Sequence, residues 1–153
     1  MNDSPRKMDW NDFADRLALE LPNLAAGTFV IISELGSDDR GRYVQFVQEH
    51  DKVIVEVVAN CFLENAERAS VAGEQAICAA GWSRPQDSNT DNWSYWLSWP
   101  AYSQDYQKLA EMVVKALRDG YGIESPASWR YRAWNNVHGN RIVELKRLGL
   151  ATF

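Results

Sequence analysis

The sequence predicts an α+β fold with an antiparallel sheet and helices packed mainly on one face of it. Apolar residues recur every three to four positions in three separate segments, which is the spacing of amphipathic helices. Between the first two segments the period falls to two, as in strands with one buried face. Short turns join these strand-like segments, which favours antiparallel neighbours. The predicted order is α-β-β-β-α-β-α, followed by a further strand and a tail.

The first helix is predicted to begin after Asp9 and to end at Pro22. A carboxylate at Asp9 can accept hydrogen bonds from the free amides of the first turn, and proline stops the helix. Residues 1–8 are polar and are expected to form a flexible tail, which leaves 9–153 as a single domain. The expected apolar stripe of this helix contains Trp10, Phe13, Leu17 and Leu21.

Three strands are predicted over residues 27–35, 42–50 and 52–60, which are rich in β-branched and aromatic side chains. In the second of them Tyr43 points to one face and Phe46 to the other, and neither face is cleanly apolar. We therefore expect a meander with helices on one side and some aromatic surface on the other.

The second helix is predicted over residues 64–80, with Gly81 placed to end it. Its small residues permit close approach to the sheet or to another helix. The side expected to be buried consists of Ala69, Ala72, Ala76, Ile77 and Ala80.

The third helix is predicted over residues 104–119, capped by Ser103 and ended by Gly120 and Gly122. Beyond it we expect a short strand over 128–134 and a further element over 140–148. The buried stripe expected for the third helix contains Tyr106, Leu109, Ala110, Val113, Ala116 and Leu117.

The stretch "NWSYWLSWP", residues 92–100, carries three of the seven tryptophans of the chain. In a strand, alternation sends Trp93, Tyr95, Leu97 and Trp99 to one face and Ser94, Trp96 and Ser98 to the other. We expect the first set to fill the core. Trp96 lies among serines and is the best candidate in this stretch for an exposed aromatic residue.

Composition excludes several classes of function. A formal charge of −5 argues against a nucleic-acid binder, which needs a basic face. Neither a signal peptide nor a membrane span is visible, and the protein is expected to be cytoplasmic. Cys61 and Cys78 are accordingly expected to be buried, reduced thiols.

No motif indicates catalysis, a metal or a cofactor. His50 and His138 lie in turn-like settings without zinc-ligand spacing. Glu34 and Glu56 lie in predicted strands, but no pocket or tuned pKa makes them an acid/base pair, and we expect them to face solvent or lie at strand ends. The sequence therefore predicts no enzyme.

Several short strings occur in a distinctive order. A helix ending in Gly-Trp and a proline is followed by a tryptophan-rich strand ending in Trp-Pro, then by "LAEMVVKALRDGYG" and a proline. Over roughly residues 9–126 this pattern resembles the actinobacterial TY-Chap domains, which are grouped with the YbjN proteins and the type III secretion chaperones. The residues that carry it include Gly81, Trp82, Trp93, Trp99, Pro100, Leu117 and Gly122.

The resemblance implies a type III secretion chaperone-like fold and a non-enzymatic module that binds a peptide or protein client in secretion. It also implies an acidic, cytoplasmic homodimer. The candidate contacts are Trp96, with Tyr43 or Phe46 on the open side of the sheet and Trp129 or Trp134 nearby.

Two alternatives remain open from the residues alone. One is a small-molecule-binding or enzymatic α+β domain with a pocket between sheet and helices. The other is an RNA contact through Arg130, Tyr131, Arg132 and Trp134, since arginine and aromatic residues together also stack on bases.

Overall fold

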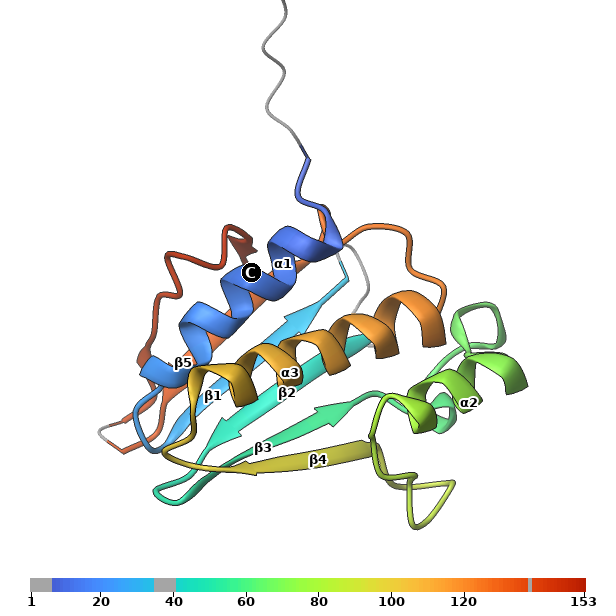
Figure 1. Cartoon of the computed structure of the whole chain (residues 1–153), viewed down its shortest axis with the longest axis horizontal. Helices are drawn as coiled ribbons and strands as arrows, with labels where there is room; N and C mark the ends of the chain where they lie inside the picture. The colour runs from blue at the N-terminus through green and yellow to red at the C-terminus, as the bar shows by residue number, and fades with distance from the viewer. Residues whose placement is uncertain (1–6, 35–40, 138) are drawn as a thin grey trace, which may run out of the picture.

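The computed structural model describes residues 7–34, 41–137 and 139–153 and shows one twisted sheet with the helices in front of one face (Figure 1). The strands follow the order β4-β3-β2-β1-β5-β6, and every neighbouring pair in this order is antiparallel. The exception is β7, which pairs with β5 in parallel. The predicted α+β class, with an antiparallel sheet and helices on one face, is confirmed.

The three predicted central strands form the expected meander but are shorter than predicted. They are β1 (Thr28–Ser33), β2 (Tyr43–Gln48) and β3 (Lys52–Val57). β4 (Trp93–Ser98) joins beside β3, whereas β5 (Arg130–Asn135) crosses to pair with β1 on the other side. The sheet therefore brings the tryptophan-rich segment and the C-terminal residues 130–153 to opposite edges.

Two antiparallel helices bury one face of the sheet. α1 (Trp10–Glu20) has the predicted Asp9 cap, completed by a reciprocal bond from the Asp9 amide to the Asp12 side chain. α3 (Ser103–Val114) packs against α1, and Figure 1 shows the two helices lying in front of the sheet. The side chains that they cover on the sheet are fully buried: Val30, Ile32, Val44, Phe46, Val53, Val55, Val57 and Trp93.

The predicted third helix needs two adjustments. Its N-cap is Tyr102, and Ser103 is the first helical residue. After Val114 the chain continues as a π-helical turn, η4 (Lys115–Gly120), which ends near the predicted position. The whole predicted stripe of this helix, from Tyr106 to Leu117, is buried as expected.

The prediction for the second helix is wrong in its first half. α2 spans only Val71–Ala79, and residues 60–70 form short 3₁₀ turns and extended segments instead. The side chain of Asn60 both donates to the carbonyl of Ala69 and accepts from its amide, which holds the chain in a turn before the helix. The Ser70 hydroxyl then accepts from the Gly73 amide and caps α2.

The buried side of α2 also differs from the prediction. Ile77 is buried as predicted, but Gly73 is buried beside it and Ala72 is exposed. A Cβ at Gly73 would lie 2.1 Å from the carbonyl oxygen of Gly120, and a Cβ at Gly120 would lie 2.4 Å from Ile77. The contact of α2 with η4 thus requires glycine on both sides. Gly81 takes a φ of 114° directly after the last turn of α2, as expected of the residue that ends it.

The C-terminal segment after β5 closes that side of the domain. The strand predicted over 128–134 is β5, shifted by one to two residues. In place of one further element, β6 (Arg141–Ile142) and β7 (Ala151–Thr152) flank turns whose Leu145 and Leu148 enter the core. At the other end, Met8 packs partly against the core, and residues 1–6 of the predicted tail lie outside the described residues.

We predict that Gly73→Ala destabilises the protein by about 1–3 kcal/mol, the usual cost of forcing a methyl group into a filled contact. The sign is informative, because the same change at an open helical site stabilises by up to about 1 kcal/mol. Urea unfolding measures the difference. Ala72→Ser, at the exposed neighbouring position, is the control and should change stability by less than about 0.5 kcal/mol. A stabilised Gly73→Ala protein would contradict the packing of α2 on η4.

Candidate functional site

The face of the sheet opposite the helices carries one apolar side chain from each of six strands at the same level. The register pairs Trp96 with Ile54, Ile54 with Val47, Val47 with Phe29, Phe29 with Trp134, and Trp134 with Ile142. Side chains opposite one another on neighbouring strands lie about 5 Å apart. We call this set the apolar row: Ile142, Trp134, Phe29, Val47, Ile54 and Trp96.

The apolar row is most exposed at its two ends. Trp96 is 61% exposed and Ile142 81% exposed, whereas the four residues between them are half-buried. The rings of Phe29 and Trp134 stack with their centres 5.3 Å apart and their planes 6° from parallel. The Lys52 ammonium lies 5.9 Å from the Trp96 ring centre. The row is therefore an ordered surface with aromatic residues near both ends.

A more polar row runs beside it, two residues along each strand. The same register aligns Arg132, Ile31, Gln45, Glu56 and Ser94. The Gln45 side chain donates a hydrogen bond to the Glu56 carboxylate. Apart from Ile31, the side chains that border the apolar row on this side are polar.

Three of the predicted contact residues lie on this open face. Trp96 is exposed, and the predicted division of its strand into a core face with Trp93 and an outer face with Trp96 is confirmed. Trp134 is half-buried within the row. Tyr43 is also half-buried but lies four residues along β2 from Val47, where its hydroxyl accepts from the Asn92 side chain at 3.1 Å.

The expectation that Phe46 lies on the open side is wrong, and Trp129 is not available there either. Phe46 is fully buried because β2 turns it, together with Val44, toward the helices. Trp129 is 3% exposed, because the chain before β5 turns it into the core. Four members of the apolar row, Phe29, Val47, Ile54 and Ile142, are absent from the sequence-based candidates, since only the strand register reveals their alignment.

The residues that carried the family resemblance divide into core and turn positions. Trp82, Trp93 and Leu117 are buried, and the Trp82 indole donates to the Met112 carbonyl at 3.0 Å. Trp99 packs partly against the core. The other three, Gly81, Pro100 and Gly122, are exposed and lie in the connections between elements.

The outer edge of β4 offers main-chain groups as well. Ser94 exchanges two hydrogen bonds with Ser83, which shows that its amide and carbonyl point away from β3. By alternation those of Trp96 and Ser98 point the same way. In the described part of the chain no strand pairs with this section of the edge.

The two carboxylates considered for catalysis have different partners and do not form a pair. Glu34 is bound by the Arg42 guanidinium, with Nη2 2.6 Å from Oε1, and also accepts from the Arg42 amide. Glu56 lies instead on the open face beside Gln45. His50 is exposed in a turn, and His138 lies outside the described residues. Among the residues described, no group of metal-ligating side chains comes together.

The prediction of buried cysteines is wrong. Cys78 is exposed on α2 and Cys61 is half-buried, and both are free thiols. Within the described ranges no helix is long and apolar enough to cross a membrane.

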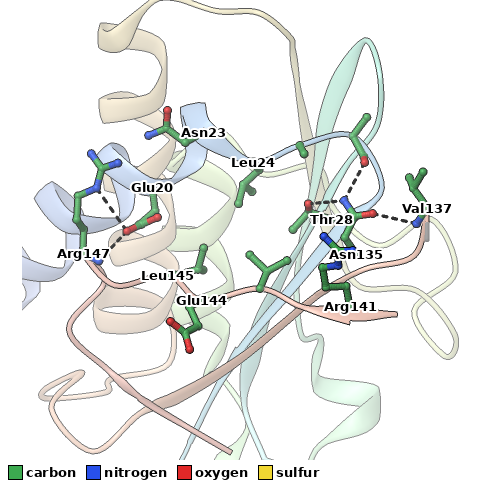
Figure 2. A pocket seen from close by; sticks show the side chains of 13 residues that line it. Glu20, Asn23, Leu24, Thr28, Asn135, Val137, Arg141, Glu144, Leu145 and Arg147 are labelled. Carbon is green, nitrogen blue, oxygen red and sulfur yellow. Dashed lines mark hydrogen bonds and ion pairs between the residues drawn. The ribbon is translucent and has the colours of Figure 1, made fainter. Parts of the chain in front are cut away.

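A pocket of about 560 Å³ lies on the side of the domain, between the end of α1 and residues 141–147 (Figure 2). Glu20 accepts from the Arg147 amide at 2.7 Å, and the Arg147 guanidinium lies 3.8 Å away. Asn135 donates to the Thr28 hydroxyl and accepts from the Val137 amide. These polar groups bind one another and fasten the C-terminal segment to α1 and β1, which is a structural role.

Comparison with known families identifies the family of the chain. Residues 3–135 match the family model TY-Chap3, described as T3SS (YopN, CesT) and YbjN peptide-binding chaperone 3. The chain belongs to this family. The match includes the helices α1 to α3 and the strands β1 to β5, so five of the six positions in the apolar row lie within it. No curated protein and no solved structure matches the chain significantly.

We predict that the Glu34–Arg42 pair makes stability depend on pH in the acid range. Burial raises the pKa of the Glu34 carboxyl, but the hydrogen bonds and charge of Arg42 outweigh it, and the pKa lies below its ordinary value near 4.5. A pKa that is lower in the folded state adds stability above the unfolded pKa, and this is lost as pH falls through the folded value. Urea unfolding should therefore show that Glu34→Gln destabilises most above about pH 5, with the difference shrinking below about pH 4.

The exposed pair Arg118–Asp119 provides the control for this series. Asp119→Asn should change stability by less than about 1 kcal/mol at any pH, because solvent screens the pair. An equal loss for Glu34→Gln at pH 3 and at pH 7 would contradict the assigned role of Arg42.

Proposed function

We propose that this TY-Chap3 domain binds a segment of a client protein along the apolar row and catalyses no reaction. The observation that carries the proposal is the alignment of six apolar side chains across the open face, with large exposed residues at both ends. The family match supports a peptide or protein as the ligand.

The dimensions of the row suit a short segment. Six strands spaced by about 4.8 Å give a row about 24 Å long. An extended chain advances about 3.4 Å per residue, so about seven residues cover this distance. Apolar side chains of such a segment would remove the Trp96, Ile54 and Trp134 side chains from water. Burial of apolar surface favours binding by about 25 cal/mol of free energy for each Å².

Shape and apolar surface are sufficient for this function. Peptide recognition of this kind places side chains against apolar surface or pairs main-chain groups with a strand edge, and neither requires a reactive group. The row and the unpaired section of β4 lie together at Trp96, which belongs to both. The apolar anchors of a client on the row therefore end beside this edge.

We predict that Trp96→Ala and Trp134→Ala each weaken client binding about tenfold or more, because large aromatic side chains contribute much of the free energy of such contacts. The purified protein is applied to an array of overlapping peptides from the proteome of its source, and the bound peptides are then measured in solution by fluorescence anisotropy. Leu19→Ala is the matched control, because Leu19 is an exposed apolar residue on α1, on the opposite side of the sheet.

Stability separates loss of contact from loss of fold. Trp96→Ala should leave the urea midpoint nearly unchanged, since the side chain is mostly exposed. If the same peptides bind the wild type, Trp96→Ala and Trp134→Ala with equal affinity, the apolar row is not the binding surface.

We further propose that the protein acts in the cytoplasm as a homodimer and that its clients are secreted proteins. The type III secretion chaperones named in the family description support this assignment. The unpaired edge of β4 supplies main-chain groups with which a second copy can pair. A two-fold pairing there would place Trp96 of each copy beside the join.

Light scattering during size exclusion tests the dimer. We predict a mass of about twice the 17.4 kDa of one chain, reduced to one chain by Ser98→Pro. Proline at Ser98 removes an amide that points outward and leaves the pairing with β3 intact, because Ser98 directs its main chain away from β3. Ser94→Pro is unsuitable as a control because Ser94 bonds Ser83, so Ser98→Ala serves instead and should remain dimeric. A wild-type protein that has the mass of one chain at 100 μM would contradict the dimer.

A further inference from the structure

A second pocket lies at the β5 end of the apolar row. It has a volume of about 460 Å³ and is formed where β6 and β7 border the open face of β5. Its apolar walls are Trp134, Ile142 and Phe153, and Arg132 provides the guanidinium. Because Trp134 and Ile142 also belong to the apolar row, the pocket continues that surface.

Two aromatic rings hold the Arg132 guanidinium. Its central carbon lies 4.9 Å from the Trp134 ring centre and 5.6 Å from that of Phe153. The Trp134 ring is itself stacked on Phe29, so its position is set by the sheet. Stacking on aromatic faces orients a guanidinium while leaving its N–H groups free at the edge.

In the described residues no carboxylate pairs with Arg132. Arg42, Arg118 and Arg147, in contrast, each lie within 4 Å of a carboxylate oxygen. Glu144 also lines the pocket, but the nearest cation to it is the Lys146 ammonium at 3.9 Å, in a pair that is largely exposed. The charge of Arg132 is therefore available to a ligand.

We infer that this pocket binds a peptide carboxylate that lies next to an apolar side chain. The planar guanidinium offers two parallel N–H donors that match the two oxygens of a carboxylate. Trp134, Ile142 and Phe153 provide apolar surface for the adjacent side chain, and the Asn140 and Thr152 side chains add polar groups. The carboxylate belongs either to the C-terminus of the peptide or to an aspartate or glutamate within it.

The inference deepens the proposed function and rests on it for the identification of the ligand as a peptide. It also sets the direction in which the client lies on the row: the carboxylate lies at the β5 end, and the client continues toward Trp96. An apolar segment without a carboxylate would occupy the row less tightly.

Three probes distinguish the sources of the carboxylate. They are acetyl-Leu-Leu-Phe with a free C-terminus, the same tripeptide as its C-terminal amide, and acetyl-Leu-Glu-Phe amide. Binding to the full chain is followed by ¹⁵N NMR through the Trp134 indole N–H and the Arg132 Nε–H. We expect at least one carboxylate probe to bind tenfold or more tightly than the leucine amide. Preference for the free acid identifies a C-terminus, and preference for the glutamate probe identifies a side chain.

Arg132→Ala should reduce binding of the carboxylate probe to the level of the amide. Arg132→Lys should give an intermediate affinity, because lysine keeps the positive charge but lacks the two parallel N–H donors of the guanidinium. Arg130→Ala is the matched control: Arg130 is exposed on the same strand and face but does not line the pocket. Equal affinity for all three probes, or equal loss in Arg132→Ala and Arg130→Ala, would overturn the inference.

Trp96→Ala separates this inference from the proposed function. The tripeptides are too short to reach Trp96 from the pocket, so their affinities should be unchanged in that variant. Carboxylate binding that persists while long peptides ignore Trp96 would retain the pocket and reject the row. If long peptides need Trp96 but not Arg132, the row is retained as the binding surface and the pocket is rejected.

Discussion

Burial of one face of the sheet beneath α1 and α3 is the interaction on which the rest of the structure depends. Each strand from β1 to β4 turns alternate side chains toward the helices, where Val30, Val44, Val55 and Trp93 are removed from water. Because the side-chain period of a strand is two, the same burial determines which residues remain outside. A slip of one residue would place the apolar row in the core and the core residues in solvent. The register of the candidate site is therefore maintained by the hydrophobic free energy of the opposite face.

The two edges of the sheet add polar binding groups to the open face. At one edge, β4 ends the sheet with main-chain groups beside Trp96. At the other, β6 and β7 border β5 and turn a flat surface into a pocket around Arg132. The polar contacts of Glu20 with Arg147 hold the intervening C-terminal segment against α1 (Figure 2). The two ends of the apolar row thus differ in chemistry, with main-chain groups at one and a guanidinium at the other.

The parts of the fold that could be predicted are those governed by local pattern. The Asp9 cap, the stripe of α3 and the division between Trp93 and Trp96 depend on spacing within one element, and each was predicted correctly. The prediction was wrong where a residue distant in the sequence determines the local structure. Asn60 binds Ala69 and shortens α2, and the close approach of Gly120 selects Gly73 for the buried side. For Phe46, both faces of its strand carried apolar residues, so local pattern did not identify the face that the helices cover.

The sequence by itself determined the class of fold, the order of its elements and the outward direction of Trp96, because these follow from periodicity and caps within short segments. Its short motifs also carried the family resemblance that the match over residues 3–135 confirms. Only the tertiary structure decided that Phe29, Trp134 and Ile142 join Trp96 in one row, since they come from strands separated by as many as 113 positions. It likewise decided that Arg132 lies between two rings. Alignment across a sheet depends on strand order and register, and those are set by the burial of the whole core rather than by any single segment.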